Sequence, residues 1–395
     1  MKNSISTEKL GWLAFFTLFI IGTDTFIAAP LLPTLSGLFQ IDPAISGWMV
    51  SAYALGYACF ALISGPVSDF ANRRTVLLLG LIAFSLTTAL CGFATGFWSM
   101  IIFRFLAGVS AAFVSPQIWA SIPLLVPRES IIKTMGVATA GLAIAQVVGI
   151  PMGSYLAIYS WQYAFWALGG ASLLLLFLLA GLFPSLPGNR GQQAFSFTSP
   201  YRHVLQNSTL KAYLLGYFIF QTGNFEAISF FGSWLFKDFG LDVTAIGRSM
   251  IAIGLGNAIG SLWGTRLVKY LGLPRLLFIA FLLLIVLYAL TSFAKTQMSA
   301  VAILTLIMMV AGLTFALLMG TLQSQADGAR GTVSSLANAA MYVGATIGGI
   351  VGGVLLQRFT GFSGVATFTV LCYLLSFLIY RAAGVFAARS PQENQ

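Results

Sequence analysis

Long apolar runs separated by short polar segments recur along the whole chain. Crossing the roughly 30 Å hydrocarbon layer of a bilayer as a helix takes about 20 predominantly apolar residues. Apolar runs bounded by polar, Gly or Pro clusters predict twelve such helices, over 10–33, 45–67, 75–95, 98–123, 134–157, 161–183, 211–236, 245–267, 273–293, 297–322, 334–357 and 362–387. The first run is too long for a signal peptide and contains a carboxylate, so we expect it to remain as a helix. The sequence therefore predicts an all-α membrane protein.

The composition supports this class and argues against two others. Only 8% of the 395 residues are charged and 58% are hydrophobic, whereas a soluble domain has about 25% charged residues. The net charge of +10 does not indicate nucleic-acid binding, because the cations are not clustered on one module. Cys59, Cys91 and Cys372 lie in apolar runs and have neither disulfide nor metal-site spacing.

The positions of Lys and Arg predict how the chain is oriented. Short cytoplasmic loops carry an excess of these residues. With the N-terminus inside, fifteen of the twenty cations fall on the cytoplasmic side, four fall outside, and Arg104 lies within a predicted span. We therefore expect a multi-pass protein of the plasma membrane, in a bacterium the inner membrane, with both termini cytoplasmic.

The chain reads as two six-helix halves. Residues 1–183 form the first predicted bundle, 184–210 a Pro-, Gly-, Ser- and Gln-containing cytoplasmic linker, and 211–395 the second bundle. "GIPMG" at 149–153 corresponds to "GIVGG" at 349–353, an offset of 200. Parallel repeats of this kind place a substrate site near the midplane, between the halves.

Three ionisable residues are predicted at membrane depth: Asp24, Arg104 and Glu226. Such residues are expensive to bury and therefore suggest function. Asp24 lies fourteen residues after Leu10 and Glu226 fifteen after Lys211, so we expect both acids in a shared central cavity. A buried carboxylate can hold a proton when a cavity is empty and release it when a cation approaches. The alternatives are a helix–helix hydrogen bond for Asp24 and a buried counter-ion role for Arg104.

The segment "GPVSDFANRR" at 65–74 is the most specific motif. We expect Gly65-Pro66 to end the second helix, and Asn72 to tolerate left-handed backbone geometry. Asp69 is placed to face the positive N-terminal end of another helix, and Arg73 and Arg74 to pair with acids of a neighbouring loop. The alternative is an ordinary turn with positive charges on the cytoplasmic side.

A glycine run and a set of aromatic residues also bear on the fold and the cargo. The run "GLGNAIG" at 254–260 has the wrong spacing for a dinucleotide site and follows no strand, so it predicts close helix packing. Aromatic residues on candidate inner helices predict a cavity suited to lipophilic, often cationic, compounds, although most aromatic residues of such a chain face lipid or pack helices. The candidates are Phe26, Tyr53, Tyr57, Phe113, Trp119, Phe225 and Trp234.

The motifs together resemble the major facilitator superfamily. Gly65-x-x-x-Asp69-x-x-x-Arg73-Arg74 resembles its loop 2–3 signature, and Arg104-x-x-x-Gly108 its fourth-helix motif, which implies a role for Arg104 in proton coupling. "GIPMG", with Gly149, Pro151 and Gly153, resembles the antiporter motif of exporters, although Pro151 comes two residues after the first glycine. "GTDTFIAAPLLP" with "GWMVSAYALGYA" is similar to the opening of bacterial twelve-helix drug:proton antiporters.

The resemblance also carries expectations for single residues. It implies that Asp69 stabilises the outward-facing state by meeting the start of the eleventh helix, near Ser334. In the second-half copy of the loop motif, Lys269 stands where the acid would be, so the contact is expected on one side only.

The leading hypothesis is a proton-coupled drug exporter that works by alternating access. The alternative is an exporter of one endogenous metabolite, such as a sugar, purine or amino-acid derivative; proton-symport uptake ranks third. An enzyme is disfavoured because no nucleophile–base pair or metal cluster falls at membrane depth. A channel is disfavoured because the repeat, with its fifth helix broken by Gly and Pro, suggests two halves that rock against each other. We expect a small-molecule substrate, protons and the lipid bilayer as partners, no cofactor, metal or nucleic acid, and a monomer.

Overall fold

The fold was analysed in a computed structural model, which describes residues 5–28, 31–41, 45, 47–149, 155–156, 159–188, 201–202, 204, 206–241, 243–326 and 329–386. These residues form helices and no strand. The principal helices are α1 (Thr7–Ile27), α2 (Leu32–Phe39), α4 (Trp48–Phe70), α5 (Arg73–Cys91), α6 (Phe97–Ala112), α7 (Ser115–Leu125), α8 (Ile131–Ile144), α10 (Trp161–Leu182), α12 (Ser208–Phe239), α13 (Val243–Leu271), α14 (Leu273–Leu290), α15 (Gln297–Ser324), α16 (Arg330–Arg358) and α17 (Ser363–Ala382).

Ten segments of this described part are long and apolar enough to cross a bilayer. α6 and α7 together form one of them, Phe97–Leu125, with a break at Phe113 and Val114. The remaining two predicted spans correspond to α12 and to α8 with the π-helical turn Ala145–Gly149 that follows it. The all-helical membrane fold is confirmed, while the count of twelve spans stays a prediction.

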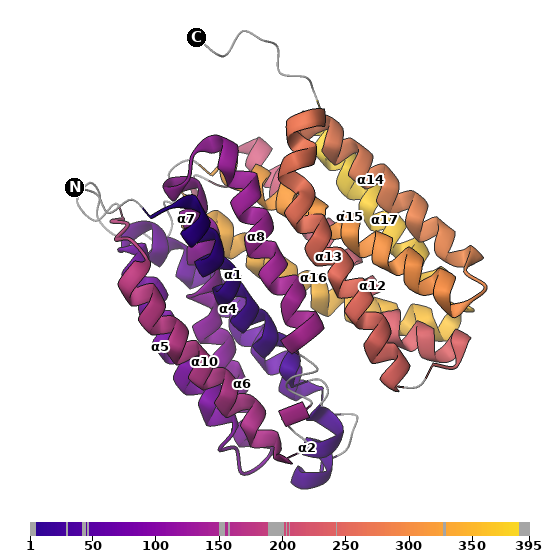
Figure 1. The fold of residues 1–395 in the computed structure, drawn as a ribbon, viewed down its shortest axis with the longest axis horizontal. Helices are drawn as coiled ribbons and strands as arrows, with labels where there is room; N and C mark the ends of the chain where they lie inside the picture. Colours follow the sequence, from indigo (N-terminus) through magenta and orange to yellow (C-terminus); the bar gives the residue numbers. More distant parts are fainter. Residues whose placement is uncertain are drawn as a thin grey trace.

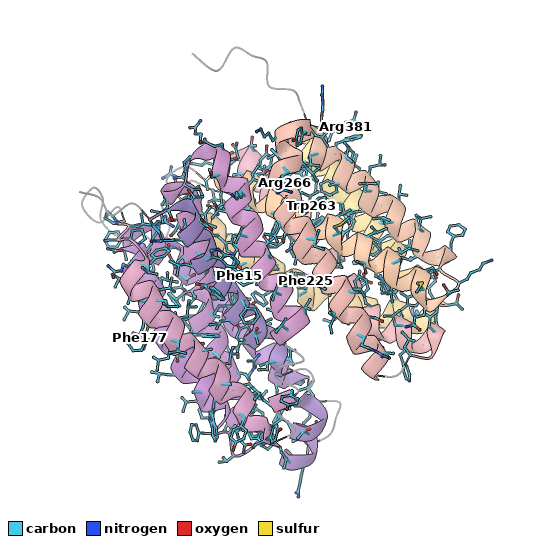
Figure 2. The ribbon with its side chains drawn as sticks, viewed as in Figure 1. Phe15, Phe177, Phe225, Trp263, Arg266 and Arg381 are labelled. Atoms are coloured by element: carbon cyan, nitrogen blue, oxygen red, sulfur yellow. The ribbon has the colours of Figure 1, made fainter. Side chains whose placement is uncertain are left out.

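The helices form two groups that lie side by side (Figure 1). α1 to α10, drawn in indigo to magenta, form one group, and α12 to α17, in salmon to yellow, form the other. The start of α1 and Arg381, near the end of α17, lie toward the same end of the molecule (Figure 2). The two groups meet mainly where α4 packs on α16 and α8 packs on α13. A Cβ atom added to Gly136 of α8 would lie 2.1 Å from the Ser261 carbonyl oxygen of α13. Small residues therefore bring the two halves into backbone contact, as in membrane helix pairs generally.

The outer surface is apolar. Phe177 of α10 is 67% exposed and points away from the bundle (Figure 2), and Trp98 and Leu174 are exposed to a similar extent. Such a continuous apolar surface would aggregate in water, and it fits the acyl chains of a bilayer.

Glycines of the run at 254–260 bring α13 against α15. Added Cβ atoms at Gly256 and Gly260 would lie 2.5 Å from the Thr305 and 1.7 Å from the Met309 carbonyl oxygens. The predicted helix-packing role of this run is confirmed.

The second helix ends later than predicted. Gly65 and Pro66 lie inside α4, which continues to Phe70, so the prediction that they end the helix is wrong. Proline has no N–H and leaves the carbonyl four residues earlier without its helical partner. That carbonyl belongs to Leu62, and it accepts a hydrogen bond from the Tyr201 hydroxyl. Burial, reinforced by the charge of Asp69, raises the pKa of Tyr201 to about 12, so its hydroxyl stays protonated to a higher pH than that of an ordinary tyrosine.

Asn72 also differs from its prediction. Its φ of −66° is not left-handed. Its side chain instead caps α5 by accepting a hydrogen bond from the Arg74 N–H at 3.0 Å, the usual role of Asn before a helix.

Candidate functional site

Asp24 and Arg104 form an ion pair inside the first half. Arg104 Nη1 lies 3.1 Å from Asp24 Oδ2, and both side chains are fully buried. The guanidinium also donates to the backbone carbonyls of Asp24, at 3.1 Å, and Met49, at 3.3 Å. Its Cζ atom lies 4.5 Å from the centre of the Tyr53 ring, within cation–π range. The geometry is that of a buried counter-ion, which was the alternative considered for Arg104, and it joins α1, α4 and α6; a role for Arg104 in proton coupling stays a prediction.

Close backbone packing holds Arg104 in place. An added Cβ at Gly108 would lie 2.0 Å from the Tyr53 carbonyl oxygen, and one at Gly56 would lie 2.2 Å from that of Phe105. α4 and α6 can approach this closely only because neither residue has a side chain. The Arg-x-x-x-Gly spacing thus places the arginine one helical turn from the closest contact of the two helices.

A layer of tyrosines connects this ion pair to the second half. The Thr25 hydroxyl lies 3.1 Å from the hydroxyl of Tyr342 on α16. The Tyr342 ring centre lies 4.3 Å from that of Tyr57 and 6.3 Å from that of Tyr53. The predicted residues Tyr53 and Tyr57 therefore contact the other half. Sequence reasoning missed Tyr342 and Thr25, because a tyrosine in an apolar run has no distinctive spacing or charge.

Glu226 lies in a separate cluster, inside the second half. The Thr369 hydroxyl of α17 donates to Glu226 Oε2 at 2.8 Å, while Oε1 is buried without a hydrogen-bond partner. Cβ atoms added at Gly348 and Gly352 of α16 would lie 2.8 and 2.9 Å from the Glu226 side chain. No ion pair with Glu226 occurs among the described residues. The prediction that both acids share one cavity is wrong, because each faces the interior of its own half.

A small cavity of about 50 Å³ lies where the halves meet. Phe225 lines it, as predicted, together with the amides Asn224 and Asn257; Phe225 lies near the centre of the molecule (Figure 2). The remaining lining residues are Thr139, Leu142, Ala143, Ile228, Ala311, Gly312, Phe315 and Met341.

The other predicted lining residues occupy different places. Trp119 is buried, with its ring centre 5.9 Å from that of Phe315 across the halves. Trp234 instead donates to Asp238 at 2.9 Å and stacks on Phe362 within the second half. Phe113 packs against Gly80 of α5. The contacts of Trp234 all lie within the second half, so cavity lining is wrong for Trp234. Phe113 is half-buried and lines none of the described pockets, so its cavity role stays a prediction.

Phe26 is half-buried near the end of α1 and lines none of the described pockets. Its predicted cavity role gains no support from this position.

Asp69 joins α4 to the start of α16. Its carboxylate accepts hydrogen bonds from the Gly331 N–H at 2.7 Å and from the Thr332 N–H and hydroxyl at 2.9 and 2.8 Å. These are the unpaired N–H groups at the positive end of α16. The resemblance implied a contact near Ser334, and the observed contact lies two and three residues before it, at Thr332 and Gly331. We call Asp69 with Gly331 and Thr332 the α4–α16 latch.

Two glycines allow the latch to close. A Cβ at Gly65 would lie 2.7 Å from the Thr332 Cα, and one at Gly331 would lie 2.7 Å from Asp69 Oδ1. A hydrogen bond between the Ser64 and Ser335 hydroxyls, 3.0 Å long, lies beside them. Gly65 of the motif therefore acts by close approach and not by ending a helix.

The arginines of the motif pair differently from the prediction. Arg73 Nη2 lies 2.8 Å from Asp69 Oδ1, one turn back on its own motif. Arg74 donates to the backbone carbonyl of Ala180 at the end of α10. Neither pairs with an acid of a neighbouring loop; both instead brace the latch and the end of the first half.

Only the first residue of the predicted Gly/Pro motif can be located. Gly149 ends the π-helical turn Ala145–Gly149, and π-turns often mark functional positions in helices. Val147 in this turn contacts Gly254 of α13, across the halves. Pro151 and Gly153 lie outside the described residues.

The family model described as Major Facilitator Superfamily matches residues 14–349 of the chain and, in a second match, residues 214–394. The second match falls on the second predicted half.

Transporters and a resistance protein from bacteria are similar to this chain over most of its length. An MFS-type transporter of Bacillus subtilis, YceJ, is 47% identical over 370 residues, covering 94% of this chain and 95% of its own. A probable sugar efflux transporter of Helicobacter pylori is 27% identical, covering 91% and 92%. A chloramphenicol resistance protein of Streptomyces lividans is 28% identical, covering 86% and 87%.

The fold is similar to that of a solved transporter. The crystal structure of the human organic anion transporter MFSD10 superposes with a TM-score of 0.79 at 17% identity, covering 95% of this chain and 99% of that one.

Proposed function

Because this chain belongs to the Major Facilitator Superfamily, we propose that it is a proton-coupled exporter that works by alternating access. The observation that carries the proposal is the fully buried ion pair of Asp24 and Arg104. A carboxylate placed at membrane depth beside a cation can exchange a proton without leaving its site. The protein is a multi-pass membrane transporter of small molecules, as its family is; the direction and the proton coupling are the proposed part.

The proposed coupling runs through Arg104. In the present state the guanidinium is held by the Asp24 carboxylate and by two backbone carbonyls. A proton on Asp24 removes the charge attraction and leaves only the carbonyl and ring contacts, so the guanidinium is held less strongly and can shift. Tyr53, under the guanidinium, also packs against Tyr342 of the other half. A shift of Arg104 would thus alter the contact between the halves.

The proposed cargo is a small lipophilic compound. The chloramphenicol resistance protein among the relatives supports drug export, and Phe225, Phe315 and Met341 give the cavity between the halves an apolar lining. A specific metabolite is the second candidate. The sugar efflux relatives favour it, as do the two amide side chains of Asn224 and Asn257, which can bind hydroxyl groups.

The proposed arrangement in the membrane follows from the charge distribution. Both termini and the α4–α16 latch would lie on the cytoplasmic side, so that the latch closes the inner end, and the functional unit would be a monomer. Residues 1–183 and 211–395 are proposed as the two bodies that rock.

Inverted membrane vesicles with an imposed proton gradient test the proposal. Wild-type vesicles should take up a lipophilic test compound, and Asp24→Asn should abolish gradient-driven uptake while inserting normally. Glu129→Gln, at an exposed acid between α7 and α8, is the matched control and should transport normally. Full gradient-driven transport by Asp24→Asn would remove Asp24 from the coupling. A response to sugars or purines with none to lipophilic compounds would favour the second candidate.

A further inference from the structure

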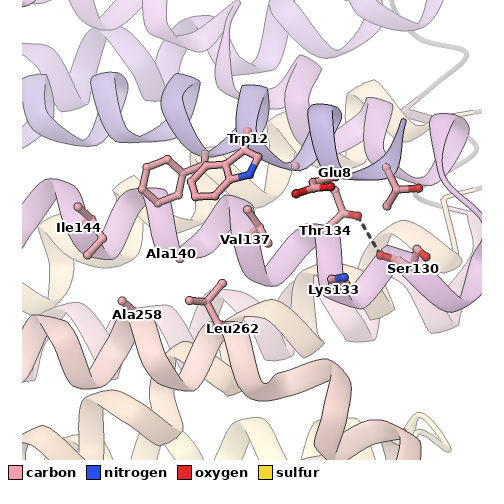
Figure 3. A pocket seen from close by; sticks show the side chains of 13 residues that line it. Glu8, Trp12, Ser130, Lys133, Thr134, Val137, Ala140, Ile144, Ala258 and Leu262 are labelled. Atoms are coloured by element: carbon pink, nitrogen blue, oxygen red, sulfur yellow. Dashed lines mark hydrogen bonds between the residues drawn. The ribbon is translucent and has the colours of Figure 1, made fainter. Parts of the chain in front are cut away.

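Two adjoining pockets open on the side of the molecule where α1 and α8 of the first half meet α13 of the second. The larger has a volume of about 510 Å³ and the smaller about 390 Å³, and both are lined by Lys133 and Leu262. We call the surface they form the α8–α13 groove. Figure 3 shows the larger pocket, with Glu8, Ser130, Lys133 and Thr134 at one end and Ile144 and Ala258 at the other.

The groove is apolar along its length. Trp12, Phe15 and Val137 line it beside Ile144 and Leu262, and the ring of Trp12 extends along it (Figure 3). Gly136 presses against Ser261 between the helices, so the floor is closed by backbone contact. A groove of this shape on a lipid-facing surface fits an acyl chain.

One end of the groove is strongly basic. Lys133, Arg266 and Lys269 line the smaller pocket with Trp263, and all three cations are exposed. None of the three forms an ion pair within the described part of the chain. The one acid that lines the larger pocket is Glu8, so the lining of the groove has an excess of two positive charges.

This end lies on the side of the chain termini. The groove begins at Thr7 and Glu8, at the start of α1, and Arg266 lies toward the same end as Arg381 (Figure 2). That side is cytoplasmic by the positive-inside rule, and the cytoplasmic leaflet carries the anionic lipids.

We propose that the α8–α13 groove binds one anionic phospholipid, with its phosphate held by Lys133, Arg266 and Lys269 and an acyl chain along Trp12 and Phe15. Two observations identify the occupant: the excess of positive charge at the basic end of the α8–α13 groove, and the apolar part of the groove that adjoins this end. Basic pockets between helices on the cytoplasmic side are the usual setting for such headgroups. Because Lys133 belongs to the first half and the other two cations to the second, the bound phosphate bridges the halves and favours the state in which these ends are together.

Native mass spectrometry of the detergent-purified protein tests the proposal without any transport assay, so its outcome is independent of proton coupling. The probes are phosphatidylglycerol and phosphatidylcholine with identical acyl chains. The wild-type protein should retain one phosphatidylglycerol in preference to phosphatidylcholine. Each cation near an anionic surface contributes about fivefold to affinity, so Lys133→Gln with Arg266→Gln and Lys269→Gln should weaken retention by roughly a hundredfold.

Two controls keep the test decisive. Arg128→Gln with Lys211→Gln and Arg275→Gln removes the same charge from exposed positions outside the groove and should leave retention unchanged. The variant Lys133→Arg with Lys269→Arg should retain the lipid. Equal retention of the two lipids, or an equal loss in both triple variants, would overturn the proposal. Displacement of the lipid by millimolar inorganic phosphate would assign the basic end to a free anion instead.

Discussion

The α4–α16 latch makes the most quantitative prediction, for Asp69→Asn. The carboxylate accepts three hydrogen bonds from the start of α16 and one from Arg73. An asparagine of the same shape has one acceptor oxygen, so it can keep the two Thr332 bonds only by turning its NH₂ group toward the Gly331 N–H. The variant therefore loses the two bonds that Oδ1 accepts, from the Gly331 N–H and from Arg73. It also weakens the two bonds from Thr332 and loses the attraction to the helix dipole.

The magnitude follows from these contacts. A hydrogen bond to a charged group contributes about 1.5–3 kcal/mol, and a charge at a helix end about 0.3–2 kcal/mol. The latch should weaken by about 3 kcal/mol or more, a factor of about 150 in the equilibrium between its closed and open states. A population that is about 99% closed at this end would then become mainly open.

Distances between spin labels on the two halves measure this shift. Arg128 and Tyr270 are exposed positions at the latch end of opposite halves, and Cys59, the exposed native cysteine, is replaced by serine. Asp69→Asn should add a long-distance population that the wild type lacks. Asp238→Asn, whose carboxylate is bonded within the second half, is the control. An unchanged distance distribution in Asp69→Asn would mean that the latch does not set the equilibrium.

Three further predictions follow from close contacts. Gly65→Ala should open the latch as Asp69→Asn does, since its Cβ would lie 2.7 Å from the Thr332 Cα, whereas Gly170→Ala meets no atom within 4 Å and should match the wild type in the same label measurement. Arg104→Gln should destabilise the protein by about 3–5 kcal/mol because it leaves a buried carboxylate unpaired, and Asp24→Asn in the same chain should restore much of that loss in thermal unfolding; no restoration would contradict the pairing. Glu226→Gln should change the unfolding temperature little, because glutamine can accept the same Thr369 hydroxyl bond, and a large fall would mean that Glu226 has an essential charged partner.

The sequence was enough to identify the charged residues, but not to predict in which direction each of their side chains points from its helix. Asp24, Arg104 and Asp69 were identifiable because a charge in an apolar run, or in a tight basic turn, has few stable partners. The helix dipole predicted that Asp69 faces the start of another helix, and the family resemblance, not the dipole, indicated which helix that is. Gly/Pro motifs and apolar runs were likewise enough to predict the all-helical fold.

The position of Glu226 could not be obtained from depth alone. Matching depth fixes how far a residue lies along a helix, but each residue turns the side chain by about 100°. With the repeat offset of 200, the counterpart of Asp24 is Asn224, and Glu226 lies two residues further, about 200° around the helix. Asn224 accordingly lines the cavity between the halves, while Glu226 faces α16 and α17. The offset itself was the signal that would have found Asn224.

The prediction of where α4 ends was wrong for a different reason. Gly and Pro usually mark a helix end. Here the Leu62 carbonyl cannot accept its helical hydrogen bond, because Pro66 has no N–H, and it accepts one from the Tyr201 hydroxyl, far away in sequence. Local composition contains no information about such a tertiary donor. The helix therefore extends to Phe70, which brings Asp69 to the start of α16.

This extension has a consequence for how the proton site and the latch communicate. Tyr53, beneath Arg104, and Asp69 of the latch lie on the same helix, sixteen residues or about 24 Å apart. α4 contacts α16 at both places, through Tyr342 and through Thr332. A rigid helix that makes both contacts should couple them, so the effects of Asp24→Asn and Asp69→Asn on the label distances should be non-additive in free energy. Two strictly additive effects would mean that the ion pair and the latch act independently, and that α4 does not transmit the state of Asp24 to the opening of the halves.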